Sequence, residues 1–229
     1  MKLIRTMLIL AVILAPLAVM GEDVAPLTQA PKGDGWVSLF DGHSLNGWHT
    51  RGTPNDSHLM SWVAVNGVLV NVPPTKDGQH GIDLISDVKL GDHELYIEFM
   101  VPQGSNSGVY LIGDYEIQVF DSFGVEKPSK TDGGAIYNKI APTVNATKPA
   151  GAWQCYHAIF HAPVVKDGVV EKHARVTLFQ NGVKVIDNQE IVGLTGAALS
   201  AEVVAEGPTY LQGDHGLVLY RNIYCKKLN

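Results

Sequence analysis

The sequence predicts an all-β protein, a jelly-roll β-sandwich with a curved inner face. Short stretches of alternating apolar and polar residues recur along the chain, and a period of two is typical of strands with one buried face. Two of the turns, Asn66-Gly67 and Asn181-Gly182, carry the strongest short-range hairpin signal. No segment has the pattern of a long helix, and the only short candidate is residues 195–205. Short strands separated by turn signals are typical of a sandwich or barrel.

The first 21 residues have the layout of a signal peptide. Two basic residues precede an apolar run over residues 7–20, and Val19 and Gly21 fit the small-residue cleavage rule, which places the cut near Gly21. The run is shorter than the roughly 20 residues of a comfortable membrane span, so an uncleaved anchor is the weaker alternative. We expect an exported protein, periplasmic or extracellular, with no stable membrane insertion of the mature chain.

The remaining chain reads as one domain. Residues 22–35 hold prolines and glycines and predict an extended lead-in, and residues 36–229 predict a single jelly-roll domain. Without Lys2 and Arg5, 15 of the 17 basic residues remain against 23 acidic ones, a formal balance of −8. This acidic balance argues against nucleic acid as a partner. The sequence leaves the oligomeric state open.

The elements follow one another in a regular order. A short strand and a glycine turn come first. One hairpin precedes the central strands of residues 94–122, and one follows them. Loops that contain proline and lysine separate these central strands from the later ones. The expected strands lie at residues 36–40, 61–65, 67–71, 83–86, three within 94–122, 153–161, 174–180, 183–187, 210–212 and 217–224. The loops are expected at residues 72–81, 123–131 and 141–150, where they could roof the sheet.

The two cysteines, Cys155 and Cys225, both fall in expected strands. In an exported chain they could form a disulfide worth about 2–4 kcal/mol. Two separate buried thiols are an equally weighted alternative, because a single pair is not a disulfide framework.

Residues 94–122 are the centre of the prediction. Their apolar positions of one parity are expected in the core: Leu95, Ile97, Phe99, Ile117 and Val119. On the other parity, Glu98, Glu116 and Gln118 are expected together on the outer face of one sheet, with Asp121 just after the third strand. A solvated face is the plain alternative. However, no Lys or Arg occurs in this stretch, and the unpaired acids favour a functional site.

A series of short motifs, all in order, resembles the 3-keto-disaccharide hydrolase family. The resemblance runs from Trp36 to the C-terminus, and the positions usually filled by Asn and by an aromatic residue hold Gln154 and His93. The motifs are Leu39-Phe40-Asp41-Gly42, Leu45-Asn46-Gly47-Trp48, Trp62 with Asn66-Gly67-Val68-Leu69, Glu98-Phe99, Asn106-Ser107-Gly108-Val109-Tyr110, Tyr115-Glu116-Ile117-Gln118, Asp121, Gly134-Ala135-Ile136-Tyr137, Pro149-Ala150-Gly151-Ala152-Trp153, Asn181-Gly182, Leu211-Gln212, His215-Gly216 and Arg221-Asn222-Ile223.

The resemblance implies a concanavalin A-like jelly roll, export, and action on glycosides already oxidised at the 3-hydroxyl. A ketone at that carbon acidifies the proton on the neighbouring carbon, and the resulting enolate can expel the anomeric substituent. Adding water afterwards makes the net reaction a hydrolysis. The E-x-D-x-x-E strand of laminarinase-type enzymes is absent, so the usual two-carboxylate retaining mechanism has no direct support.

Such a reaction needs a base, an acid and a group that stabilises the enolate. The catalytic candidates are Glu98, Glu116 and Asp121 as base, His215 as acid and Arg221 as the positive charge. The candidates for sugar binding are Asn106, Gln118, Tyr137 and Gln212, with Trp62 stacking on a sugar face. Four of these have structural alternatives: a partner of an acid for Arg221, a strand cap for Asp121, a turn residue for His215 and a core residue for Trp62.

The nine histidines show no metal-binding spacing, so we expect no cofactor, while a calcium ion held by oxygens remains compatible with such a fold. The expected partner is a carbohydrate substrate. A non-catalytic, lectin-like sugar-binding module is the main alternative, and an exported interaction domain without a sugar ligand is the third. The excess of acids over the expected sheet favours an enzyme.

Overall fold

A computed structural model describes residues 27–55 and 57–228, so the expected leader and its cleavage site lie outside the described part. The described residues contain no helix, and therefore none long and apolar enough to span a membrane. The one short helix candidate, residues 195–205, is a series of turns and bends instead. The strands are β1 (Val37–Ser38), β2 (Trp48–Thr50), β3 (His58–Leu59), β4 (Trp62–Val65), β5 (Val68–Asn71), β6 (His80–Gly81), β7 (Leu84–Leu90), β8 (His93–Met100), β9 (Asn106–Leu111), β10 (Tyr115–Phe120), β11 (Trp153–His161), β12 (Val164–Lys166), β13 (Val169–Lys172), β14 (Ala174–Gln180), β15 (Val183–Ile191), β16 (Gly207–Leu211) and β17 (Val218–Lys227).

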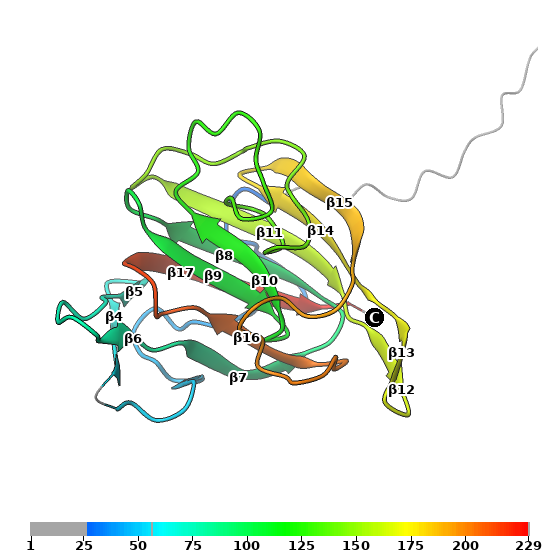
Figure 1. The fold of residues 1–229 in the computed structure, drawn as a ribbon, viewed down its shortest axis with the longest axis horizontal. Coiled ribbons are helices and arrows are strands. Elements are labelled where there is room, and N and C mark those ends of the chain that lie inside the picture. Colours follow the sequence, from blue (N-terminus) through cyan, green and yellow to red (C-terminus); the bar gives the residue numbers. More distant parts are fainter. Residues whose placement is uncertain (1–26, 56, 229) are drawn as a thin grey trace, which may run out of the picture.

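The predicted β-sandwich is confirmed (Figure 1). One sheet has eight strands in the order β15-β14-β11-β8-β17-β5-β4, with β1 beside β17, and the other has five in the order β10-β9-β16-β7-β2. Residues of both sheets, such as Ile97 and Ile117, join one buried hydrophobic cluster between them. The outer face of the five-stranded sheet is thus left free for other contacts.

Both predicted hairpin turns are present. Asn66-Gly67 joins β4 to β5 with φ values of 50° and 80°, and Asn181-Gly182 joins β14 to β15 with 53° and 84°. Two successive positive φ angles are what a type I′ turn needs, and the Asn-Gly pair tolerates them. These turns fix the register of the flanking strands.

The parity of the central stretch is confirmed, but its assignment to one sheet is wrong. The expected core residues Leu95, Ile97, Phe99, Ile117 and Val119 are all fully buried. However, β8 belongs to the eight-stranded sheet and β10 to the five-stranded sheet. Residues 101–105 carry the chain from one sheet to the other instead of forming a hairpin. Glu98 therefore lies on the opposite side of the molecule from Glu116 and Gln118, because alternation fixes the side of a strand but not its sheet.

The cysteines are two free, buried thiols. Cys155 pairs with Glu98 of β8 from one side, and Cys225 pairs with Leu95 of β8 from the other. Two strand spacings, about 9–10 Å, therefore separate them, which is beyond the reach of a disulfide.

Residues 133–140 close the outer edge of β10. The amide of Gln118 donates to Ala135 O at 2.9 Å, and the amide of Tyr137 donates to Glu116 O at 3.0 Å. Ile136 is fully buried, which anchors this segment on the sheet. The pairing also brings Tyr137 beside Glu116.

Candidate active site

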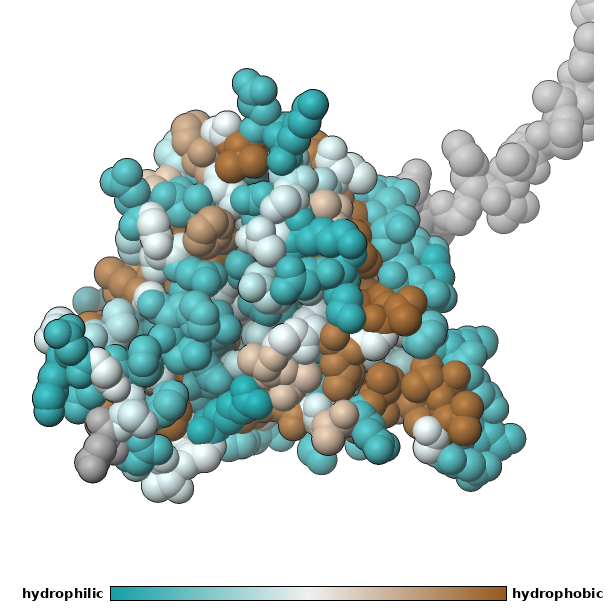
Figure 2. All heavy atoms as spheres, viewed as in Figure 1, coloured by the Kyte–Doolittle hydropathy of each residue, from teal (hydrophilic) through white to brown (hydrophobic). Residues whose placement is uncertain are grey.

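The outer face of the five-stranded sheet carries a cavity, here called the central cavity. Because Val109, Leu111 and Ile117 point into the core, the intervening residues Tyr110 and Glu116 point outward. The cavity has a volume of ≈ 210 Å³. It is lined by Asn106, Tyr110, Glu116, Gln118, Tyr137, Gly196, Ala197, Gln212 and His215. The surface over this sheet is mainly hydrophilic, while exposed valines gather over the β12–β13 hairpin (Figure 2).

The central cavity brings together most of the site residues proposed from the sequence. They come from β9, β10, the segment that closes the β10 edge, and the chain just after β16. The residues brought together are Asn106, Glu116, Gln118, Tyr137, Gln212 and His215. Four other candidates, Glu98, Asp121, Arg221 and Trp62, do not line it.

Glu116 is the buried acid of the cavity, with only 3% of its surface exposed. Burial raises the pKa of its carboxyl group to about 7, against the opposing effects of a hydrogen bond from Tyr110 and of the nearby His215. The hydroxyl of Tyr110 lies 2.9 Å from both Glu116 Oε2 and Gly196 O. Since this hydroxyl has one proton, both acceptors are satisfied only when Glu116 is protonated and donates to Tyr110. The geometry and the raised pKa agree that Glu116 exchanges a proton readily near neutrality.

Gly108, on the neighbouring strand, leaves the space in which the Glu116 carboxylate lies. A Cβ atom at this position would stand 2.6 Å from Glu116 Oε1 and 2.9 Å from its Cγ. We expect Gly108→Ala to shift the carboxylate and to lower by about tenfold or more any turnover that depends on Glu116, since small displacements of a reacting group are costly.

Gly91→Ala is the matched control, because its new Cβ would meet only Ala205 O at an ordinary 3.5 Å. Steady-state kinetics and thermal melting of both variants make the measurement. Wild-type turnover in Gly108→Ala would show that the position of this carboxylate does not matter.

His215 faces the same cavity and is held by its neighbour Asp214. The Nδ1 atom of His215 is hydrogen-bonded to Asp214 Oδ1, which raises the pKa of the imidazole and favours its protonated form. The negative charge of Glu116 acts in the same direction. The cavity thus combines a carboxylate that can take a proton with an imidazolium that can give one.

Amides form much of the remaining wall. Gln118 Nε2 donates to Thr131 O at 3.2 Å, which fixes the side chain. Asn106 Oδ1 and Gln118 Oε1 are buried and have no hydrogen-bond partner among the described residues. Unpaired buried acceptors are costly, and a ligand rich in hydroxyl groups would supply the missing donors after a small side-chain adjustment.

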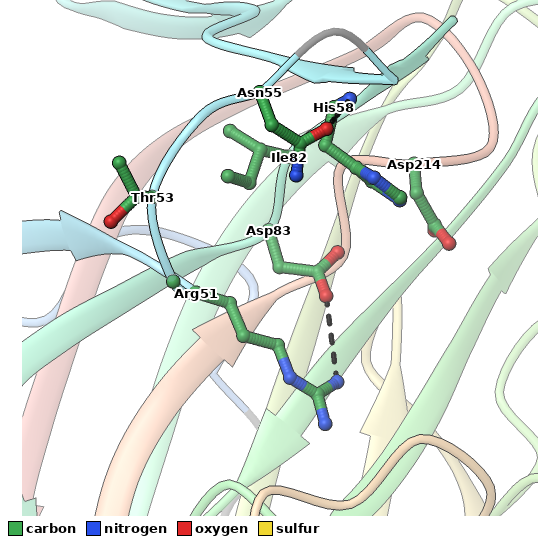
Figure 3. Close-up of a pocket in the computed structure, with 8 residues that line it drawn as sticks. Arg51, Thr53, Asn55, His58, Ile82, Asp83 and Asp214 are labelled. Carbon is green, nitrogen blue, oxygen red and sulfur yellow. Dashed lines mark hydrogen bonds and ion pairs between the residues drawn. The ribbon is translucent and has the colours of Figure 1, made fainter.

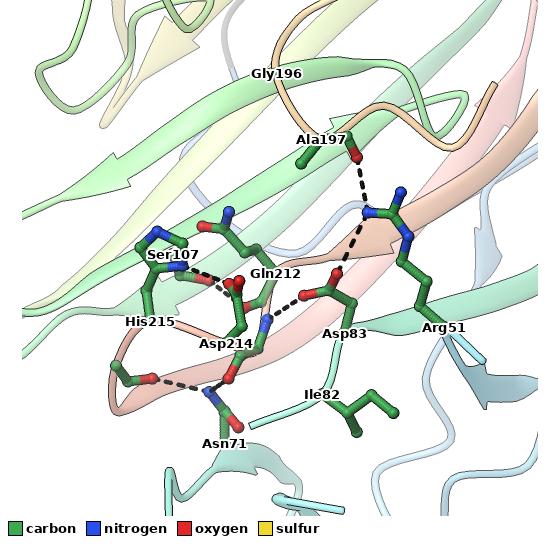
Figure 4. Close-up of polar contacts among 12 residues, drawn as sticks. Arg51, Asn71, Ile82, Asp83, Ser107, Gly196, Ala197, Gln212, Asp214 and His215 are labelled. Carbon is green, nitrogen blue, oxygen red and sulfur yellow. Dashed lines mark hydrogen bonds and ion pairs between the residues drawn. The ribbon is translucent and has the colours of Figure 1, made fainter. Parts of the chain in front are cut away.

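Several contributors were missed from the sequence. Arg51 donates from Nη1 to Ala197 O at 2.9 Å (Figure 4). Its Nη2 donates to Ala198 O at 3.0 Å. It thereby holds the segment of residues 192–206 that forms one wall of the cavity. Tyr210 stacks on Tyr110 with 4.1 Å between ring centroids and donates to Asp83 Oδ2 at 2.8 Å. Of these contributors, only Tyr110 could have been found from the sequence, because its parity places its side chain on the outer face of the strand.

Glu98 and Arg221 form a separate cluster on the outer side of the eight-stranded sheet. Arg221 Nε lies 2.7 Å from Glu98 Oε2, and its guanidinium stands 3.9 Å over the ring of Trp153. Asn222 Nδ2 and the hydroxyl of Tyr96 also donate to this carboxylate. The expectation that Arg221 supplies the positive charge beside Glu116 is therefore wrong, and its alternative as a partner of an acid is confirmed.

Trp62 and Asp121 also have structural roles, which were the alternatives to their proposed roles in the site. Trp62 is 2% exposed, donates to Ile82 O at 2.6 Å and stacks on Tyr220, so the expectation of an exposed sugar platform is wrong. Asp121 follows β10 and accepts a hydrogen bond from Gly104 N at 3.0 Å. It ties the end of that strand to the turn before β9. Among residues 27–55 and 57–228, no group of three or more His, Cys, Asp or Glu is arranged to hold a metal ion.

Comparison with solved structures shows the same fold in known proteins. A candidate glycosyl hydrolase from Parabacteroides distasonis is 30% identical, with a TM-score of 0.70 over 85% of this chain and 84% of that one. A second from the same organism is 19% identical, with a TM-score of 0.61 over 85% and 94%. A carbohydrate-binding module from Bacillus subtilis, 12% identical with a TM-score of 0.50 over 79% and 96%, shares the fold alone.

Sequence comparison identifies the family. A 3-keto-disaccharide hydrolase from Bacteroides thetaiotaomicron is 26% identical over an alignment of 149 residues, and the match covers 52% of this chain and 50% of that protein. The chain thus spans about half the length of this curated relative. The model of the 3-keto-alpha-glucoside-1,2-lyase-like domain matches residues 35–226, nearly the whole described part. The chain therefore belongs to the 3-keto-alpha-glucoside-1,2-lyase-like domain family.

Proposed function

We propose that the protein cleaves the glycosidic bond of 3-keto-glycosides in the central cavity. The observation that carries this proposal is the buried carboxylate of Glu116, with a pKa of about 7, in one cavity with an imidazole whose pKa its Asp214 partner raises. A carboxyl group that titrates near neutral pH and an imidazole favoured in its protonated form suit proton removal and proton delivery at neighbouring atoms. The family and the name of the Bacteroides relative support the choice of a 3-keto sugar.

In the first step, Glu116 takes the proton from C2 of the sugar, next to the ketone at C3. The electron pair left behind forms an enolate, with negative charge on the C3 oxygen. Because Arg221 stands on the other sheet, the stabilising groups are hydrogen-bond donors that line the cavity: the amides of Asn106 and Gln212 and the hydroxyl of Tyr137.

In the second step, the C3 carbonyl re-forms, a double bond forms between C1 and C2, and the bond from C1 to the leaving oxygen breaks. His215 gives its proton to that oxygen. Water then adds across the double bond: its hydroxyl goes to C1, its proton returns to His215, and Glu116 gives its proton back to C2. The sum is hydrolysis, and both residues end in their starting states.

We also propose that the protein acts after export. The support is the order of basic, apolar and small residues over residues 1–21.

Incubation with a 3-keto-glucoside and with its unoxidised parent tests the proposed chemistry. We expect release of the leaving group from the ketone alone, because only the ketone acidifies the C2 proton. Exchange of that proton with deuterium oxide would report the first step directly. Equal cleavage of both compounds would contradict proton abstraction, and saturable binding without cleavage would favour the lectin-like alternative.

A further inference from the structure

A second, larger concavity lies next to the central cavity and is here called the side hollow. It has a volume of ≈ 440 Å³ (Figure 3). Its lining consists of Arg51, Gly52, Thr53, Asn55, His58, Ile82, Asp83 and Asp214. These residues come mainly from the segments that follow β2 and precede β7. The mechanism above uses none of them except Asp214, as the partner of His215.

Three links show that the two spaces adjoin. Asp214 lines the side hollow and is bonded to His215, which lines the central cavity. Arg51 lines the hollow, and its guanidinium donates to Ala197, which lines the cavity (Figure 4).

The third link runs through the sheet, where Asp83 accepts from Tyr210 and Tyr210 stacks on Tyr110 of the cavity. The charges of Asp83 and Asp214 also reach Glu116, since both help to raise the pKa of its carboxyl group. The two spaces thus share one boundary, formed by Asp214 and His215 on one side and Arg51 on the other.

The volumes of the two spaces indicate that a glycoside larger than one sugar ring occupies both of them. Sites for drug-sized ligands have volumes of about 300–1,000 Å³, and the central cavity, at ≈ 210 Å³, is smaller than this range. It has room for one sugar ring but not for two. A larger glycoside must therefore extend beyond the cavity, and the side hollow offers the adjoining space.

The chemistry of the side hollow favours a hydroxylated ligand. Carboxylates, a guanidinium, an amide, an imidazole and a hydroxyl line it, and Ile82 is its one large apolar residue. Asp83 accepts from Gly213 N at 2.9 Å and lies 3.6 Å from Arg51, so the inner wall is held rigidly. Thr53, Asn55 and His58 are exposed at the rim. Closely spaced donors and acceptors match the vicinal hydroxyls of a sugar and leave little apolar surface for an aromatic group.

The position of the proposed acid, His215, indicates which space holds the reacting ring and which holds the leaving group. A residue that protonates the leaving oxygen must stand where the reacting ring ends and the leaving group begins. His215 has this place, because it lines the central cavity while its partner Asp214 lines the hollow. We propose that the side hollow is the subsite for the leaving group and that it takes a sugar or similar polyhydroxylated group. This inference rests on the proposed function and adds the place in the fold where the second half of the substrate binds.

The test compares two substrates that differ only in the leaving group: the 3-keto form of an α-linked glucose disaccharide and methyl 3-keto-α-glucoside. In the full-length protein, Thr53→Trp fills the hollow from its exposed rim. We expect it to lower kcat/KM for the disaccharide by about tenfold and to leave the methyl glycoside within about twofold. His58→Ala, which removes a rim group without filling space, should lower kcat/KM for the disaccharide alone by about threefold.

Val169→Trp, on the exposed β13 strand, is the control for an added surface indole and should change neither substrate. If wild type cleaves both substrates and both hollow variants leave their ratio unchanged, the subsite is overturned and the proposed function stands. If wild type cleaves neither 3-ketone, the proposed function fails and the inference falls with it. If Thr53→Trp lowers the melting temperature, the ratio of kcat/KM for the two substrates in His58→Ala decides whether the subsite is supported or overturned.

Discussion

Glu116→Gln is expected to lower turnover of a 3-keto-glycoside by about 10²-fold or more, the usual scale for loss of an acid–base catalyst. Glutamine keeps the shape of the side chain and can still bond Tyr110, but its amide cannot take the C2 proton. The fold should survive, because the substitution removes a buried ionisable group and leaves its volume unchanged. Steady-state kinetics with a 3-keto-glucoside make the measurement.

Glu98→Gln is the matched control, since Glu98 is a half-buried carboxylate on the opposite sheet, paired with Arg221. It should keep wild-type turnover. The pH profile adds a second readout: kcat/KM of the wild type should rise as pH increases through about 7, where Glu116 loses its proton. Loss of activity in Glu98→Gln with full activity in Glu116→Gln would move the base to the other sheet.

His215→Asn is expected to have the second large effect, a fall in turnover of about 10²-fold. Asparagine keeps a hydrogen-bonding side chain near Asp214 but has no proton to give to the leaving oxygen. Since His215 is proposed to act in its protonated form, the wild-type rate should fall as pH rises through its raised pKa, and this alkaline decline should vanish in the variant.

Two further comparisons sharpen this result. His161→Asn alters another His–Asp pair, with Asp92 at 3.1 Å, which is exposed and distant from the cavity, and it should have no effect. A substrate whose leaving group is a good one, such as a nitrophenol, needs no protonation and should be cleaved by His215→Asn nearly as fast as by wild type. If His215→Asn lowered the rate equally for good and poor leaving groups, His215 would have a role other than acid catalysis.

Much of the fold could be predicted because alternation and Asn-Gly turns are local signals. The residues of one parity lie in the core as the alternation predicts: Leu95, Ile97, Phe99, Ile117 and Val119. The assignment of Glu98 failed because nothing local distinguishes a hairpin from a crossing between sheets at residues 101–105. The prediction of an exposed Trp62 was wrong for a related reason: the burial of its ring depends on Tyr220 and Ile82, which lie far along the chain.

The candidate site was predictable where it lies within the central stretch and the motifs near it. The outward parity of Glu116 and Gln118 on β10 could be read directly, and Asn106 lies on the neighbouring strand β9. Arg51 and Asp83 come from connecting segments, and their place depends on pairing between β2 and β7 and on the distant residues 197 and 198. No pattern around Arg51 or Asp83 shows such long-range contacts.

Burying Glu116 has a consequence for the stability of the whole domain. In the unfolded chain this carboxyl group has a pKa near 4.5, while in the folded protein its pKa is about 7. Between these values the folded protein holds a proton that the unfolded chain has released. The contribution of this group to the free energy of unfolding therefore falls as pH rises from 4.5 to 7, by on the order of 3 kcal/mol. The ionisation that the proposed base needs thus makes the native state less stable near neutral pH.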